Sequence, residues 1–146
     1  LAREAYFVDF AKAMKNELTT PLMVTGGFRT ASAMEQALKS GAADVIGLGR
    51  PMCVMPEAAK RLLGGMAMLP KVENQLKLLP EWLSGLRKLK MVRGIEGFAV
   101  QYWFYSQLYA LGRTGRTKPD MTVFAAMREV ESYQKQWLKE RRAAGL

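Results

Sequence analysis

Residues Val24 to Pro51 read VTGGFRTASAMEQALKSGAADVIGLGRP, and their pattern indicates the fold of the first half of the chain. It holds two short apolar runs, at 22–25 and 44–48, and glycines follow each of them. Between the runs, a helical pattern begins with the capping-box spacing of Ser32 and Glu35 and reaches about Ser40, where Gly41 suits a left-handed cap. The stretch therefore predicts a strand, a helix and a second strand, joined by glycine-rich turns.

The flanking residues extend this alternation in both directions. A helical period covers residues 5–18 and stops before Pro21, and Pro56 suits the first turn of a helix that ends at Gly64-Gly65. Short, uninterrupted apolar strands are typical of parallel sheets buried on both faces, and their alternation with helices indicates an α/β fold. Two strands cannot close a sheet, and a (β/α)8 TIM barrel takes roughly 250 residues. We therefore expect residues 1–65 to form the C-terminal quarter of such a barrel, its last two strands.

Residues 66–146 show no strand pattern and are predicted to form an α-helical C-terminal extension. One helical stretch opens at Pro80, and a second runs from about Ile95 to Leu111 and ends at Gly112. A polar loop over residues 112–116 comes next. A third helix is expected after Pro119-Asp120.

The composition limits the chemistry that the chain can perform by itself. Its 146 residues include no histidine and a single cysteine, Cys53. This excludes Ser-His-Asp and Cys-His nucleophile systems, His-ligated zinc and an internal disulfide. With no secretory leader and no apolar run of about 18 residues, we expect a cytoplasmic protein without a membrane span. Because the sequence opens at Leu1 within a helical pattern, we expect a fragment or a processed product.

Positive charge is concentrated in the second half of the chain. The net charge is +9; residues 1–65 hold 8 basic and 6 acidic residues, whereas residues 66–146 hold 14 and 7. A basic half with the interleaved rings of Phe98 to Tyr109 could suit nucleic acid or an anionic membrane surface. The charges are nevertheless spread at intervals rather than gathered in one stripe. We therefore favour a solvated helical surface, with the rings packing the helices together, and expect no nucleic-acid partner.

Two strand-end loops carry the chemical signal. The first, at 24–30, contains Gly26 and Gly27, and the second, at 47–51, contains Gly49 and Arg50. Glycine lets the backbone approach an anion, and loop amides and the N-terminus of the following helix then point at phosphate oxygens. Arg50 adds a guanidinium fork that suits two phosphate oxygens. Either glycine cluster alone suits a tight turn as well, but together with Arg50 they favour a phosphate site.

The same stretch resembles the closing strands of the old yellow enzyme family of NAD(P)H:flavin oxidoreductases. The resemblance lies in the Gly-Gly-Phe-Arg-Thr loop, the Gly-Ala-Ala-Asp turn and the Gly-Leu-Gly-Arg-Pro ending of residues 24–51. A looser resemblance, to tails found on some flavin-oxidoreductase relatives, lies in Trp103, Gln107-Leu108, Leu111-Gly112 and Lys118-Pro119-Asp120.

The resemblance implies a TIM barrel that binds FMN non-covalently. The cofactor-binding residues that it implies are Gly26, Gly27, Phe28, Gly49 and Arg50. Backbone amides of the two loops would hold the phosphate, and the Arg50 side chain would pair with it. Phe28 would pack either beside the flavin or in the core, and Arg29 is expected to be a surface charge at the start of a helix.

In this family, a hydride passes from NADH or NADPH to flavin N5 and then to the β-carbon of an electron-poor alkene. The resemblance therefore implies an ene-reductase whose substrate is a small activated alkene. The family's carbonyl-gripping His/Asn or His/His pair and its proton-donating Tyr belong to earlier strands and are not in this sequence. We therefore assign no catalytic residue here and expect the chain alone to be inactive.

Two other functions stay open from the sequence. One is another phosphate-binding or FMN-binding TIM-barrel enzyme, such as a hydroxy-acid oxidase or a nucleotide dehydrogenase. The other is a basic helical binding module that acts through residues 66–146. The sequence also leaves open whether the protein forms a homo-oligomer.

Overall fold

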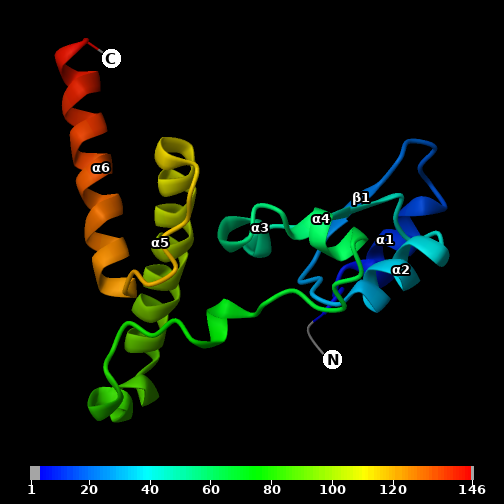
Figure 1. The fold of residues 1–146 in the computed structure, drawn as a ribbon, viewed down its shortest axis with the longest axis horizontal. Helices are drawn as coiled ribbons and strands as arrows, with labels where there is room; N and C mark the ends of the chain where they lie inside the picture. Colours follow the sequence, from blue (N-terminus) through cyan, green and yellow to red (C-terminus); the bar gives the residue numbers. More distant parts are fainter. Residues whose placement is uncertain (1–3, 146) are drawn as a thin grey trace. The chain divides into compact units, whose positions relative to one another are not determined.

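The structure, a computed structural model, describes residues 4–145, apart from the side chains of Glu81, Ser84, Leu86, Arg87 and Arg93. The chain divides into two compact units, residues 1–71 and residues 72–146. The first unit contains α1 (Val8–Lys15), β1 (Met23–Thr25), α2 (Ala31–Lys39), β2 (Val45–Gly47), α3 (Arg50–Val54) and α4 (Ala58–Leu63). The second contains the 3-10 helices η1 (Val72–Asn74) and η2 (Glu81–Lys88), followed by α5 (Lys90–Thr114) and α6 (Val123–Ala143) (Figure 1).

The two strands of the first unit form a parallel pair, so the predicted α/β character is confirmed. Met23 pairs with Val45, and Thr25 pairs with Gly47 at the other end of the ladder. Asp44 ties the two strands together at their start, because its carboxylate accepts from the Leu22 amide at 2.6 Å and forms an ion pair with Lys15 of α1. This contact explains the Asp of the Gly-Ala-Ala-Asp turn as a structural residue.

A polar residue caps the start of helix α2 and a glycine follows its end, but the N-cap differs from the one that the sequence predicts. The cap is Thr30, whose hydroxyl accepts from the Ala33 amide at 3.4 Å, so the capping box expected at Ser32 is wrong. The C-terminal end follows the expectation, because Gly41 directly after the helix has φ +71°. Only glycine adopts this left-handed conformation without strain.

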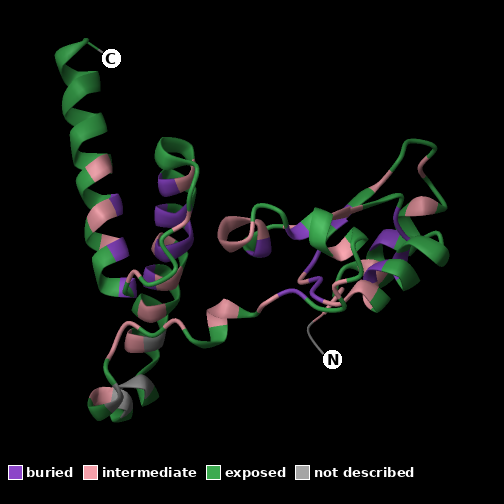
Figure 2. Cartoon of the chain, in the orientation of Figure 1, coloured by how far each residue is buried: buried purple, intermediate pink, exposed green. Residues whose placement is uncertain are grey.

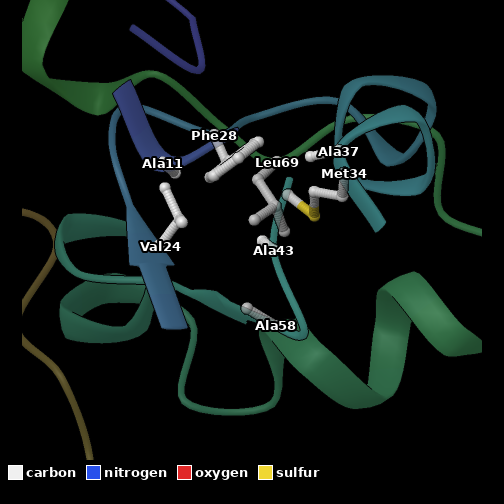
Figure 3. Close-up of a cluster of buried hydrophobic side chains, with 8 residues drawn as sticks. All are labelled: Ala11, Val24, Phe28, Met34, Ala37, Ala43, Ala58 and Leu69. Atoms are coloured by element: carbon white, nitrogen blue, oxygen red, sulfur yellow. The ribbon is translucent and has the colours of Figure 1, made fainter. Parts of the chain in front are cut away.

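A small apolar core holds the first unit together. Figure 3 shows its eight buried side chains: Ala11, Val24, Phe28, Met34, Ala37, Ala43, Ala58 and Leu69. Leu69 comes from the segment after α4, which returns to the first glycine loop. There the Leu69 amide donates to Arg29 O at 2.7 Å, and the Ala31 amide donates to Ala67 O at 2.9 Å. Residues 66–71 therefore pack with the first unit. This unit ends at residue 71, whereas the sequence predicts the end of the barrel part at residue 65.

The strands are not buried on both faces, contrary to the sequence prediction. Val24 is 5% exposed, whereas Met23 is 63% and Val45 is 49% exposed. The described helices cover only part of a sheet of two strands, so apolar side chains at the start of both strands face solvent.

The second unit is built on two long helices that run in the same direction (Figure 1). Helix α5 continues past Gly112 and ends at Gly115, which has φ +69°, so the predicted end at Gly112 is wrong. Residues 115–122 then return alongside α5 before α6 begins. The N-cap of α6 is Thr122, whose hydroxyl accepts from the Ala125 amide at 3.2 Å. The stretch expected to be helical after Pro80 is the 3-10 helix η2.

The rings of α5 are buried only in part. Trp103 and Phe104 are 2% and 3% exposed, whereas Phe98 is 74% and Tyr105 is 45% exposed. The expectation that the rings pack the helices together therefore applies to Trp103 and Phe104, and to Tyr109, whose ring lies 5.1 Å from that of Tyr133 on α6. Figure 2 shows the buried residues of α6 confined to its first turns. Among the described residues, no helix has the length and apolar character needed to cross a membrane.

Candidate phosphate-binding site

The register of the sheet brings the two glycine loops to the same edge. Thr25 and Gly47 are the last paired residues of β1 and β2. Gly26 directly follows the first of these, and Leu48-Gly49 follows the second. Because the strands are parallel, both loops leave the sheet at its carboxyl edge, which is where ligands bind in α/β sheets.

The first loop needs glycine at both of its positions, for different reasons. Gly26 is buried, and a Cβ added to it would lie 3.2 Å from Cδ2 of Phe7, so the site has little space for a side chain. Gly27 is half-buried and has φ +71°, a conformation that a β-branched residue would adopt only with strain. The loop therefore turns sharply, and its two glycines have no side chains that could cover the backbone.

The second loop lies against the first strand and then opens to solvent. A Cβ on Gly47 would collide with Oγ1 of Thr25, which shows how closely the two strand ends approach. By contrast, a Cβ on Gly49 would meet no atom within 4 Å, and both Gly49 and Arg50 are exposed. Arg50 is the first residue of α3. A ligand can therefore reach the Gly49 backbone and the Arg50 side chain from solvent.

The amides of these loops divide into two groups. Among the turn and loop hydrogen bonds of residues 4–145, none has the amide of Gly27 or Gly49 as its donor, whereas the parallel register directs the Gly26 amide at Gly47 O. The amides of Arg29 and Thr30 instead donate to Oε1 of Glu4, at 2.6 and 2.5 Å. The available donors thus lie on the glycines at the sheet edge.

Glu4 occupies the N-terminus of α2. Its Oε1 also accepts from the Thr30 hydroxyl at 3.0 Å. Partial burial opposes ionisation of Glu4, but the hydrogen bonds from Thr30 and Arg29 and the nearby Lys71 charge hold the pKa of this carboxyl below its usual value. The expectation that the helix N-terminus after the first loop would help to bind phosphate is therefore wrong, because a carboxylate of the protein already fills that position. Nothing in the sequence pattern near Glu4 indicated this role.

The two residues after the glycine pair are buried. Phe28 is 1% exposed and belongs to the core of the first unit, which is one of the two placements expected for it. Arg29 is 5% exposed, and its Nη1 donates to Phe28 O at 2.8 Å. The interpretation of Arg29 as a surface charge is therefore wrong. The burial of these two residues anchors the first loop. The exposed cation of the second loop is Arg50.

Cys53, the one thiol of the chain, follows the second loop on α3. It is partly buried, and burial raises the pKa of the thiol above its usual value. A raised pKa reduces the fraction of thiolate at neutral pH, so Cys53 is a poor nucleophile. The chemistry of the site therefore rests on backbone amides and one guanidinium.

The fold and the carboxyl edge of the sheet define an α/β unit with two glycine loops. Several curated proteins are similar to this chain in sequence. The chain is 35% identical over 115 residues to the NADH-dependent flavin oxidoreductase iccE of Talaromyces variabilis. Two proteins named NADH-dependent flavin oxidoreductase iliE also match. The one from Neonectria sp. (strain DH2) is 47% identical over 57 residues, and the one from Hypocrea jecorina (strain QM6a) is 43% identical over 61 residues.

These matches cover 78%, 38% and 41% of this chain, but only 28%, 7% and 15% of the respective relatives. Homologues named NADH-dependent flavin oxidoreductase thus cover part of the chain, which is consistent with a fragment of an old yellow enzyme family protein, and the resemblance to that family is confirmed. No family model matches the sequence. No solved structure matches the chain.

Proposed function

We propose that this chain supplies the FMN-phosphate site of an NADH-dependent flavin oxidoreductase of the old yellow enzyme type. The observation that carries the proposal is the parallel pairing of Thr25 with Gly47, which puts both glycine loops at one edge of the sheet. The names of the relatives support flavin as the cofactor and NADH as the reductant. FMN fits the site because its terminal phosphate is the group that such loops bind.

In this proposal, the amides of Gly27 and Gly49 donate to the phosphate oxygens. The amides of Gly27 and Gly49 have no acceptor among the turn and loop hydrogen bonds of the described residues, and open space surrounds Gly49. The Arg50 guanidinium pairs with the phosphate from the solvent side. Phe28 and Arg29 contribute indirectly, because their burial holds the first loop in place. The carboxylate of Glu4 keeps a second anion from the N-terminus of α2, which confines the phosphate to the glycines.

The exposed strand faces support a larger sheet in the whole protein. Met23 and Val45 expose apolar side chains from neighbouring strands, and the outer edges of both strands lack partners within the described sheet. Unpaired edges and uncovered apolar faces are rarely left in a folded protein. Further strands would cover them, and we propose that β1 and β2 are the last two strands of a (β/α)8 barrel.

Bound FMN would supply the chemistry for hydride transfer from NADH to the β-carbon of an electron-poor alkene. The residues of this chain act before that reaction, since they bind and orient the cofactor through its phosphate. We assign to them no role as a proton donor or in contact with the alkene carbonyl. We therefore propose an ene-reductase in which this segment determines how tightly FMN is held.

Titration of the full-length apoprotein with FMN tests this proposal. Arg50→Ala should weaken FMN binding by roughly ten- to a hundredfold, because a hydrogen bond to a charged group contributes about 1.5–3 kcal/mol. Lys60→Ala is the matched control, since Lys60 is an exposed cation on α4, outside both glycine loops, and this variant should bind FMN as the wild type does. An unchanged dissociation constant in Arg50→Ala would mean that Arg50 does not contact the phosphate.

A further inference from the structure

The N-terminus of α2 holds an anion of the protein in the place where such helices bind a ligand anion. A single oxygen of Glu4, Oε1, accepts from the Arg29 amide at 2.6 Å, the Thr30 amide at 2.5 Å and the Thr30 hydroxyl at 3.0 Å. In nucleotide sites, the N-terminus of a helix that follows a strand and a glycine loop binds the phosphates. Glu4 therefore occupies an anion position at the end of the first glycine loop.

A strained turn directly after Glu4 shows that its contacts are strong enough to shape the chain. Ala5 has φ +56°, and in the described part of the chain it is the one residue other than glycine with a positive φ. This left-handed conformation costs a residue with a side chain about 1–2 kcal/mol, and it persists only where the surrounding contacts hold it. The Val8 amide, which donates to Ala5 O at 3.0 Å, holds the turn on one side, and the three hydrogen bonds of Glu4 hold it on the other.

The anion position of Glu4 is adjacent to the proposed phosphate position. Arg29 follows Gly27 by two residues, and two residues of chain span at most about 7 Å. In a diphosphate, one bridging oxygen joins the two phosphates, so the second must lie beside the first. On the side of α2 it would meet the ionised Glu4 carboxylate. On the side of Gly49, where an added Cβ would meet no atom within 4 Å, it would remain in solvent.

We propose that Glu4 is a specificity-determining residue whose carboxylate takes the place of a second phosphate and restricts the site to ligands with one phosphate group. The inference rests on the proposed function, because it requires that the glycine loops bind the phosphate of a flavin nucleotide. FMN has a single phosphate, which the glycines hold at a distance from Glu4. FAD has two, and its second phosphate would lie beside a like charge and find the amides of Arg29 and Thr30 occupied. The site therefore selects the mononucleotide.

Titration of the full-length apoprotein with FMN and with FAD tests this inference through the ratio of the two dissociation constants. The wild type should bind FMN more tightly than FAD. Because all three hydrogen bonds end on one oxygen, Glu4→Gln can keep them through its amide oxygen and removes only the charge. This variant should shift the ratio toward FAD by about fivefold or more, since like charges a few Å apart repel each other even in water.

Two further variants complete the series. Glu4→Ala also frees the amides at the N-terminus of α2 and should shift the ratio toward FAD by about tenfold or more, because hydrogen bonds to a charged phosphate become available. The matched control is Glu35→Gln, which removes an exposed carboxylate within α2 that pairs with Lys39 at 2.8 Å. This control should leave the ratio unchanged.

The ratio separates the effect of the charge from a loss of structure. A loosened loop would weaken the binding of both flavins, whereas only removal of the competing anion favours FAD over FMN. Glu4→Gln carries the test if Glu4→Ala does not fold. A wild type that binds FAD as tightly as FMN would overturn the inference, and so would a Glu4→Gln variant with the wild-type ratio. A wild type that binds neither flavin would contradict the proposed function itself, so the two failures are distinguishable.

Discussion

Gln107 binds the backbone of Lys118 with both atoms of its side-chain amide. Its Nε2 donates to Lys118 O at 3.1 Å, and its Oε1 accepts from the Lys118 amide at 2.7 Å. Gln107 is fully buried, and one turn earlier the Trp103 indole donates to Met121 O at 2.7 Å. These contacts fix the returning segment 115–122 to α5. They give a structural reason for the Trp103, Gln107 and Lys118 pattern in the second unit.

Replacing Gln107 by Leu should destabilise the second unit. Leu has a similar volume but leaves the Lys118 amide and carbonyl without their partners, which costs about 1–3 kcal/mol. The control Gln101→Leu changes an exposed position of the same helix and should alter stability by less than about 0.5 kcal/mol. Urea unfolding of both variants measures the difference. Equal stabilities would show that the returning segment does not depend on Gln107.

Glu129 accepts three hydrogen bonds, and two of them join α6 to the same region. Its carboxylate accepts from Ser106 Oγ at 2.6 Å and from both Lys118 Nζ and the Tyr133 hydroxyl at 2.9 Å. Partial burial raises the pKa of Glu129, but the bonds from Ser106, Lys118 and Tyr133 outweigh it and hold the pKa below its usual value. The ionised form of Glu129 is therefore the one that the fold stabilises.

This pKa shift predicts how the stability of the unit depends on pH. A carboxyl whose folded pKa is depressed stabilises the fold fully above its unfolded pKa, about 4.3 for Glu, and loses this contribution as pH falls through the folded pKa. Glu129→Gln should therefore be less stable than the wild type at pH 7, and the difference should shrink in acid. Unfolding free energies across a pH series measure it. A difference that stays constant from neutral to acid pH would contradict the depressed pKa.

Most elements of the fold were predictable from local signals, but the helix ends were less so. Pro21 and the glycines mark the strands of the first unit because they restrict or free the backbone within a few residues. Gly112 gave the same signal as Gly115, yet only Gly115 adopts a left-handed conformation. A left-handed glycine is a common helix end, and the contacts of Lys118 and Met121 with Gln107 and Trp103 favour the turn at Gly115, which no local pattern distinguishes from Gly112.

The candidate site was predictable only in its backbone part. The glycines of the two loops follow directly from the strand pattern, and the parallel pairing brings them together. The role of Glu4 was not predictable, because it depends on contacts with Arg29 and Thr30, which lie 25 and 26 residues further along the chain. The burial of Arg29 likewise follows from the return of residues 66–71, which no local pattern indicates.

In the proposed site, the loop of Gly27 binds the phosphate of FMN rather than merely turning the chain. Gly27 and Gly41 have the same φ, +71°, and Gly41 lies at the far end of α2, where an added Cβ would meet no atom within 4 Å. Gly27→Val and Gly41→Val thus impose a similar backbone strain, about 1–3 kcal/mol, at two different places. Only the first of them should interfere with a ligand at the sheet edge.

The most direct test is thermal melting of the full-length wild type and both valine variants across an FMN series. A ligand that binds only the native state adds about 2.7 kcal/mol of stability at a hundredfold excess over its dissociation constant. We expect both variants to melt earlier than the wild type without FMN. With FMN, Gly41→Val should gain as much stability as the wild type, and Gly27→Val should gain little. An equal gain in the two variants would contradict the proposal and leave the loop of Gly27 as a turn.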